Sequence, residues 1–177
     1  MRRMPPLALT MGEPAGIGGE IAAGAWHALR ATGTAFFLID DATRLGGAPL
    51  RVIDAPEAAA AAFAEALPVL HRPLPRPATP GHPHPANAPA VIAAIEEAVA
   101  LARAGRAAGV VTNPIQKSML TAAGFPHPGH TEFLGALAGT GVPPVMMLAS
   151  PDLRVVPVTA HEPLRVANDR PTTDMIV

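Results

Sequence analysis

The sequence predicts an α/β fold, in which buried strands alternate with helices in an open sheet. The first observation is a short apolar run at 7–10, which a glycine-rich turn joins to a segment with apolar residues at helical spacing. The second is a pair of further apolar runs, at 36–39 and 109–114, which helical segments separate. A strand, a glycine-rich turn and a helix in this order are typical of α/β units, where backbone amides can approach a ligand.

The glycine-rich turn does not match either standard nucleotide-binding loop. Its glycines lie at 12, 16, 18 and 19, and Glu20 stands where a phosphate-binding loop needs lysine followed by serine or threonine. The spacing also differs from the Gly-x-Gly-x-x-Gly pattern of dinucleotide-binding folds. The motif therefore favours a tight strand-to-helix turn.

The strand at 36–39 ends in two acidic residues, Asp40 and Asp41. An acidic residue after a second strand can hold a ribose hydroxyl, or it can cap the next helix. Because the glycine fingerprint is missing upstream, the cap is the favoured interpretation. A short strand at 51–53 and an alanine-rich helix at 55–67 are expected to follow.

The stretch 68–89 is rich in proline. Each proline fixes φ and removes an amide donor, so we expect extended, polyproline-like chain crossing a surface. His82 and His84 lie in this stretch; a metal-binding pair is conceivable, but solvated loop histidines are favoured. The stretch is also a candidate crossing between two subdomains.

A long helix is expected after Asn87, ending near Gly105. Its core stripe is predicted to consist of Val91, Ile95, Val99 and Ala102. The strand at 109–114 then leads into a helix whose first turn carries Lys117, the only lysine of the chain. Ligands in open α/β sheets bind at the carboxyl ends of strands, so Lys117 could pair with an acidic substrate there. The alternative is an ordinary surface lysine.

Prolines and glycines at 124–129 exclude a regular element and deliver His130 and Thr131 to the start of a helix. Thr131 is a good N-cap residue, and a helix N-terminus attracts anions. A histidine beside such an end can bind a phosphate or carboxylate, or transfer a proton. The alternative is a capped helix with a histidine that faces solvent.

The last part of the chain contains two apolar runs, at 145–148 and 155–158, which we expect to be buried strands of a hairpin. His161 follows the second run, where a rigid scaffold could aim a metal ligand, although a loop histidine is the alternative. Residues 171–177 have the pattern of a helix opening with only about one turn, which predicts that the sequence stops within an element.

Composition narrows the classes of function. Hydrophobic residues make up 49% and charged residues 15%, and the net charge of −1 gives no electrostatic case for nucleic acid or an anionic membrane. Without cysteine, disulfides, thiolate catalysis and cysteine-ligated zinc are excluded, so a metal would need His, Asp or Glu. No signal-peptide core and no apolar run of about 18–20 residues is evident, so a soluble cytoplasmic protein is expected.

Six separated motifs carry a family resemblance. They lie at 10–18, 85–89, 111–117, 128–133, 145–148 and 153–161. Together they resemble the amino-terminal half of the 4-hydroxythreonine-4-phosphate dehydrogenase family of pyridoxal phosphate biosynthesis. The resemblance implies an isocitrate/isopropylmalate dehydrogenase-like fold, incomplete here, with 1–177 as the amino-terminal part of a two-subdomain enzyme whose carboxy-terminal half is absent.

The resemblance also implies an activity and a site. The activity is NAD-dependent oxidation and decarboxylation of 4-phosphohydroxy-L-threonine to 3-amino-2-oxopropyl phosphate, with a divalent metal (zinc, magnesium or cobalt), in a homodimer with a shared active site. His130 and Thr131 would bind substrate, His161 would be one of three histidines on the metal, and Lys117 would be a catalytic candidate near the cleft. His130 and His161 are thus expected to converge on one cleft. Because the other metal ligands should lie beyond Val177, this chain alone is expected to be inactive.

Two alternatives stay open on the sequence. One is a dehydrogenase of the same family for another acid, either a phosphorylated sugar acid or an aromatic cis-dihydrodiol carboxylate. The other is a non-catalytic, truncated α/β protein.

Overall fold

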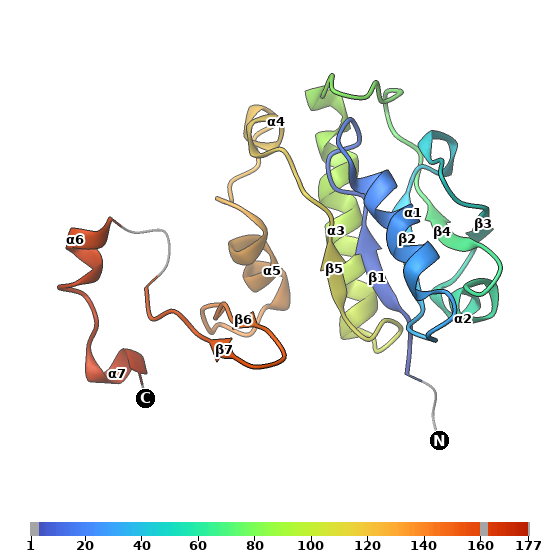
Figure 1. Cartoon of the computed structure of the whole chain (residues 1–177). Helices are drawn as coiled ribbons and strands as arrows, with labels where there is room; N and C mark the ends of the chain where they lie inside the picture. The colour runs from blue at the N-terminus through green and yellow to red at the C-terminus, as the bar shows by residue number, and fades with distance from the viewer. Residues whose placement is uncertain (1–3, 160–162, 177) are drawn as a thin grey trace. The chain divides into compact units, whose positions relative to one another are not determined.

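The computed structural model describes residues 4–159 and 163–176, which form two compact units, Met1–Gly129 and His130–Val177. The elements of both units are labelled in Figure 1.

The first unit contains a five-stranded sheet in the order β3-β4-β2-β1-β5, and every neighbouring pair of strands is parallel. The strands are β1 (Leu7–Thr10), β2 (Phe36–Asp40), β3 (Leu50–Ile53), β4 (Leu67–His71) and β5 (Val110–Thr112). In the register, Leu9 of β1 lies opposite Leu38 on one side and Val111 on the other. This arrangement confirms the predicted open α/β sheet.

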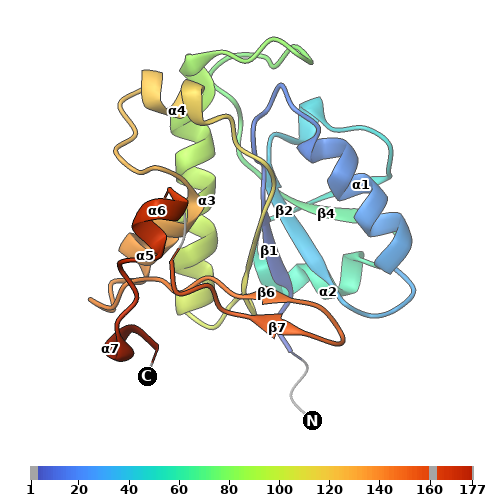
Figure 2. The same ribbon diagram turned by 60° about the vertical axis from the view of Figure 1, so that its left-hand side comes forward.

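Two long helices cover opposite faces of this sheet, as Figure 2 shows: α1 (Gly18–Leu29) and α3 (Ala88–Arg103). On the α1 face, the buried core includes Leu9, Leu38 and Trp26. Trp26 is 1% exposed, and its indole N–H donates a 2.7 Å hydrogen bond to the carbonyl of Phe63. The remaining helical segments of this unit are η1 (Ala42–Arg44), η2 (Pro56–Ala58), α2 (Ala59–Ala62), η3 (Pro85–Asn87) and α4 (Lys117–Ala122).

The helix expected at 55–67 is wrong in its extent, because only Pro56–Ala58 and Ala59–Ala62 are helical and β4 begins at Leu67. β4 was expected to be surface chain, yet Pro68 is buried within it. Successive residues of a strand direct their N–H groups to opposite neighbours, and Leu67 N donates to Pro49 O on the β3 side. Pro68 would therefore face β2, whose pairing with β4 begins only at Val69, so the missing donor costs no ladder bond.

The rest of the proline-rich stretch is a loop that contacts the turn after β1. Thr79 and His82 form an isolated antiparallel bridge, and Gly81 N donates a 2.8 Å hydrogen bond to Ala15 O. The loop therefore braces the glycine-rich turn. A subdomain crossing in 68–89 stays a prediction.

The long helix of the first unit is a core helix, although the segment Pro85–Arg103 has the length and the mean hydropathy, 1.2, of a membrane span. It is not a continuous apolar run, because Glu96 and Glu97 interrupt it. Val91 and Ile95 are buried as predicted, whereas Val99 is only partly buried and the stripe continues through Ala98 and Leu101. The apolar face of α3 thus packs within the protein.

The second unit contains α5 (His130–Ala138), α6 (Leu164–Ala167), α7 (Thr173–Ile176) and the antiparallel strands β6 (Leu148–Ala149) and β7 (Arg154–Val155). The hairpin is confirmed, but the prediction of buried strands is wrong, because each strand has two residues and both are exposed. Each strand of this hairpin pairs only with the other, and strands of two residues present too few side chains to form a buried face. α5 begins at His130, so Thr131 lies in its first turn rather than at its cap.

Candidate functional site

The strand order of the first unit predicts where a ligand binds. The chain passes from β1 to β2 on one side, whereas β5 pairs with β1 on the other side. In open α/β sheets, ligands bind in the crevice outside the carboxyl ends of the strands at such a switch point. The segments that reach this edge are the loop 11–17 after β1, residues 41–44 after β2, and residues 113–116 after β5.

Two glycines allow the loop 11–17 to pack against the end of β5. Gly12 has a φ of +68°, and a Cβ at this position would lie 2.6 Å from Pro114 O and 2.7 Å from Asn113 Cβ. A Cβ at Gly18 would lie 2.6 Å from Met11 O. The loop is therefore the tight strand-to-helix turn that the motif predicted, with glycine required for close backbone approach.

Gly12→Ala should lower the free energy of unfolding by about 2 kcal/mol or more, because the alanine would be strained by the positive φ and its Cβ would clash with the chain just after β5. The measurement is urea unfolding followed by the fluorescence of Trp26, the only tryptophan. Gly24→Ala is the matched control: Gly24 is helical, and no neighbouring atom of the described residues lies within 4 Å of the place a Cβ would take, so we expect no loss. Equal stability of the two variants would contradict the prediction.

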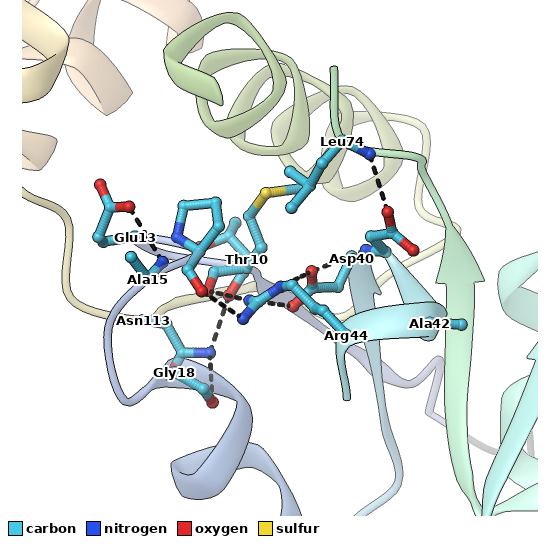
Figure 3. Close-up of polar contacts among 12 residues, drawn as sticks. Thr10, Glu13, Ala15, Gly18, Asp40, Ala42, Arg44, Leu74 and Asn113 are labelled. Carbon is cyan, nitrogen blue, oxygen red and sulfur yellow. Dashed lines mark hydrogen bonds and ion pairs between the residues drawn. The ribbon is translucent and has the colours of Figure 1, made fainter. Parts of the chain in front are cut away.

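Asn113, directly after β5, forms hydrogen bonds to both ends of the turn after β1. Its side chain is buried, and Nδ2 donates hydrogen bonds to Thr10 O at 3.0 Å and to Gly18 O at 3.2 Å. Both bonds are drawn in Figure 3. Since Thr10 ends β1 and Gly18 begins α1, one amide fixes how far apart the strand and the helix lie.

Asp40 and Arg44 form a paired fork on the other side of this turn (Figure 3). Arg44 Nε donates to Asp40 Oδ1 and Nη2 donates to Asp40 Oδ2, each at 2.7 Å. The same guanidinium donates from Nη1 to Pro14 O at 2.8 Å and from Nη2 to Met11 O at 3.4 Å. Arg44 therefore connects the end of β2 with the loop after β1.

Asp40 is fully buried, and burial raises its pKa to about 6 even though Arg44 opposes this shift. Asp41 differs: although burial opposes it, hydrogen bonds from Leu74 N and from Thr43 lower its pKa below the ordinary value. Asp41 Oδ1 accepts from Thr43 N at 2.9 Å, so the predicted capping role is confirmed for Asp41. Asp40 instead serves the ion pair.

The pKa of Asp40 predicts a pH dependence of stability. A carboxyl whose pKa rises from 3.8 to about 6 on folding contributes stability that is complete below pH 3.8 and is lost as the pH rises through about 6. Relative to Asp40→Asn, the native chain should therefore lose up to about 3 kcal/mol of unfolding free energy between pH 4 and 7. Urea unfolding of both proteins at a series of pH values measures this difference; a native chain that instead gains stability relative to Asp40→Asn as the pH rises would show that Arg44 holds the pKa of Asp40 below its ordinary value.

The loop after β1 also forms one wall of a cavity of about 640 Å³. Pro14 and Gly16 of the loop line it together with Arg44. Gly47 and His27 also line it, and His27 Nε2 lies 2.9 Å from Gly47 O. A smaller and more apolar cavity of about 360 Å³ lies beside β1 and β5. The larger cavity therefore extends from the loop at the carboxyl edge of the sheet along α1 as far as His27. The smaller cavity follows β1 from Leu7 along the α1 side of the sheet.

The predicted site residues lie in both units. Lys117 is the first residue of α4, exposed and directly after β5, as expected for the carboxyl edge of the sheet. His130 is the first residue of α5 and is partly buried; Thr131 is exposed and lines a cavity of about 690 Å³ in the second unit. His161 lies outside the described residues. The roles of these four residues, and the convergence of His130 with His161, therefore stay predictions.

Sequence reasoning missed Arg44 and Asn113. The spacing of Asp40 and Arg44, four residues apart just after a strand, was a usable signal, because such a pair can close within one helical turn. For Asn113, the only signal was an amide side chain at the end of a strand before proline. His84, considered as a metal ligand, accepts from Ala86 N and lies 3.1 Å from Arg76 through Nε2.

The parallel sheet and the switch in its strand order define a class, the open α/β proteins, whose ligands generally bind at the carboxyl edge of the sheet. Comparison with known proteins specifies the family within this class. The family model described as "Pyridoxal phosphate biosynthetic protein PdxA" matches residues 28–177. The chain belongs to this family.

Individual relatives agree with this assignment. The chain is 49% identical to a 4-hydroxythreonine-4-phosphate dehydrogenase of Bradyrhizobium diazoefficiens, with 97% of this chain and 55% of the relative covered. For the enzyme of that name from Caulobacter vibrioides the identity is 46%, with 97% and 54% covered. A crystal structure of the Klebsiella pneumoniae enzyme superimposes with a TM-score of 0.83 at 31% identity, covering 97% of this chain and 56% of that one.

These comparisons confirm both the family resemblance and the isocitrate/isopropylmalate dehydrogenase-like fold class. The chain spans about half the length of the curated relatives that it matches.

Proposed function

We propose that this chain is the amino-terminal part of a 4-hydroxythreonine-4-phosphate dehydrogenase of pyridoxal phosphate biosynthesis. The observation that carries the proposal is the 49% identity, over 97% of the chain, to a relative with this name. The reaction oxidises the secondary alcohol of 4-phosphohydroxy-L-threonine: NAD accepts the hydride, and the hydroxyl proton leaves to a base. The resulting 3-keto acid loses carbon dioxide and gives 3-amino-2-oxopropyl phosphate. We place the protein in the cytoplasm.

Within this proposal, His130 and Thr131 hold the substrate. Both lie in the first turn of α5, where the helix end carries a partial positive charge. A phosphate or carboxylate is the group that such an end favours, and the substrate carries both. Lys117 is proposed to pair with an acidic group of the substrate, because an exposed lysine directly after β5 lies at the edge where ligands of open α/β sheets bind.

The described part of the chain does not by itself form a metal site. Among residues 4–159 and 163–176, no group of three or more His, Cys, Asp and Glu is arranged to hold an ion. A catalytic zinc needs about three protein ligands and an open position. A divalent metal with His161 as one ligand therefore requires further ligands beyond any that the described residues bring together.

A homodimer is also part of the proposal. Several apolar side chains of the second unit are exposed, including Val145 at 73% and Leu148 at 59%. Exposed apolar groups of this kind are typical of surfaces that a partner covers. A second copy of the full-length protein would be the partner, and sedimentation velocity of that protein measures its assembly.

The test uses a chimera in which residues 1–177 are joined to the carboxy-terminal remainder of the Bradyrhizobium diazoefficiens relative. We expect the chimera to produce NADH from 4-phosphohydroxy-L-threonine and to stop when a chelator removes the metal. The 177-residue chain alone should produce none. The natural relative, assayed in parallel, controls for the substrate and the assay.

Two results would contradict the proposal in different ways. Turnover of only a phosphorylated sugar acid or an aromatic cis-dihydrodiol carboxylate would assign the chain to another dehydrogenase of the family. A folded chimera without activity on any of these acids, beside an active natural relative, would favour a non-catalytic protein.

A further inference from the structure

The loop 11–17 is held in place by hydrogen bonds from several other segments of the first unit. Carbonyl groups of the loop accept from the Arg44 side chain after β2 and from a backbone amide of the proline-rich loop, and the carbonyl groups that flank the loop accept from the Asn113 side chain after β5. The donors are Arg44 to Met11 O and Pro14 O, Asn113 to Thr10 O and Gly18 O, and Gly81 N to Ala15 O. A loop with this many supports has one position rather than several.

Arg44 is the charged member of this set. Its side chain is 11% exposed and forms a fork with Asp40, which is fully buried at the end of β2. A guanidinium is planar and presents its donors at fixed angles, so pairing with a rigid carboxylate also fixes the direction of the remaining N–H groups. Arg44 thereby holds the loop at a fixed position relative to the end of β2.

We propose that Arg44 is a positioning residue, which sets the place of the loop 11–17 and thus the shape of the wall that this loop gives to the ligand crevice. Two contacts carry the proposal: Nη1 donates to Pro14 O at 2.8 Å, and Pro14, Gly16 and Arg44 together line the cavity of about 640 Å³. The kinetic consequence rests on the proposed dehydrogenase function, whereas the effect on the loop does not.

A simpler role for Arg44 would be to neutralise Asp40, because a buried carboxylate without a partner is strongly destabilising. The two roles use different atoms. Asp40 is bound by Nε and Nη2, whereas the shorter bond to the loop, to Pro14 O, is made by Nη1; only the longer bond to Met11 O shares Nη2 with Asp40. The two roles can therefore be distinguished by two kinds of substitution. One keeps a positive charge beside Asp40, and the other removes both charges together.

The first test measures amide hydrogen exchange in the 177-residue chain. Arg44→Lys keeps a positive charge near Asp40, but one ammonium cannot reach both the carboxylate and the loop carbonyls. The double variant Asp40→Asn with Arg44→Met removes both charges. In both proteins we expect amides in 12–20 to exchange about tenfold faster or more, while amides of β2 and β4 keep their native rates.

Arg106→Met is the matched control. Arg106 also forms a two-bond pair with a carboxylate, Glu57, but both side chains are largely exposed and neither bonds to the loop. Exchange in 12–20 should stay native in this variant. Native exchange of the loop in the double variant would overturn the proposal, because Arg44 would then serve only as the partner of Asp40.

The second test follows the reaction in the chimera. With Arg44→Lys, KM for the substrate should rise about tenfold with a smaller change in kcat, because a loosened wall weakens binding before it affects chemistry. Arg106→Met should leave both constants unchanged. If the parent chimera turns over no substrate, the proposed function fails, and the exchange experiment still decides the role of Arg44. Faster loop exchange with unchanged KM in an active chimera would overturn the link between the loop and the crevice.

Discussion

His161→Ala in the chimera is expected to abolish metal-dependent turnover, with a fall in kcat on the order of a thousandfold or more. The physical reason is the loss of one of about three ligands, which leaves a site unable to retain a divalent ion at ordinary concentrations. Three quantities are measured: NADH formation, bound metal by elemental analysis, and the circular dichroism spectrum. The spectrum should stay near native.

His82→Ala controls for the general effect of removing a histidine. His82 lies in the exposed proline-rich loop of the first unit, where the backbone bridge to Thr79 does not depend on the side chain. This variant should keep its metal and its activity. Full activity and normal metal content in His161→Ala would rule out the ligand assignment.

His130→Ala in the chimera is expected to weaken substrate binding without loss of metal. A hydrogen bond to a charged group contributes about 1.5–3 kcal/mol, so KM should rise about 10- to 100-fold. Steady-state kinetics gives KM, and elemental analysis gives the metal content. Because His130 begins α5, its replacement should leave the nine-residue helix formed, which circular dichroism checks.

His127→Ala is the control for this variant, since His127 lies in the same loop and precedes the helix. It should change KM little. A His130→Ala protein that loses its metal together with its activity would contradict the separation of the two roles and would make His130 a ligand.

The first unit was predictable where the strands are buried on both faces. The run predicted at 7–10 coincides with β1, and the run at 36–39 differs from β2 by one residue. Strands of a parallel sheet are covered by helices on both sides, so they appear as continuous apolar runs in the sequence. β4 was not predicted, because Pro68 interrupts its apolar run. A proline fits into this strand only because the pairing of β4 with β2 begins one residue later, at Val69.

The second unit was predictable only in its local features. The turn at 150–152 does join two antiparallel strands, because turn preference is local. Burial of the apolar runs was not predictable, because it depends on what packs against them. The helices α6 and α7, each of four residues, supply little surface for that purpose.

The candidate site was predictable as a set of loops but not as a set of contacts. Asp41 could be recognised as a cap from its position after a strand. Arg44 could not be linked to Met11 and Pro14, because these residues lie some thirty positions earlier and meet it only once β1 and β2 are neighbours. Local pattern places a charged residue on a loop, whereas the order of the strands decides what it touches.

The exposed apolar side chains of the second unit have a practical consequence for handling the chain. Leu153, Leu164 and Val142 are each more than 60% exposed, and Val145 and Leu148 add to this exposed apolar surface. Made alone, the polypeptide should bind environment-sensitive dyes and be less soluble than residues 4–129, which have a buried core around Trp26. The yield of soluble protein, compared between residues 1–177 and residues 4–129, measures how much the exposed apolar surface lowers solubility.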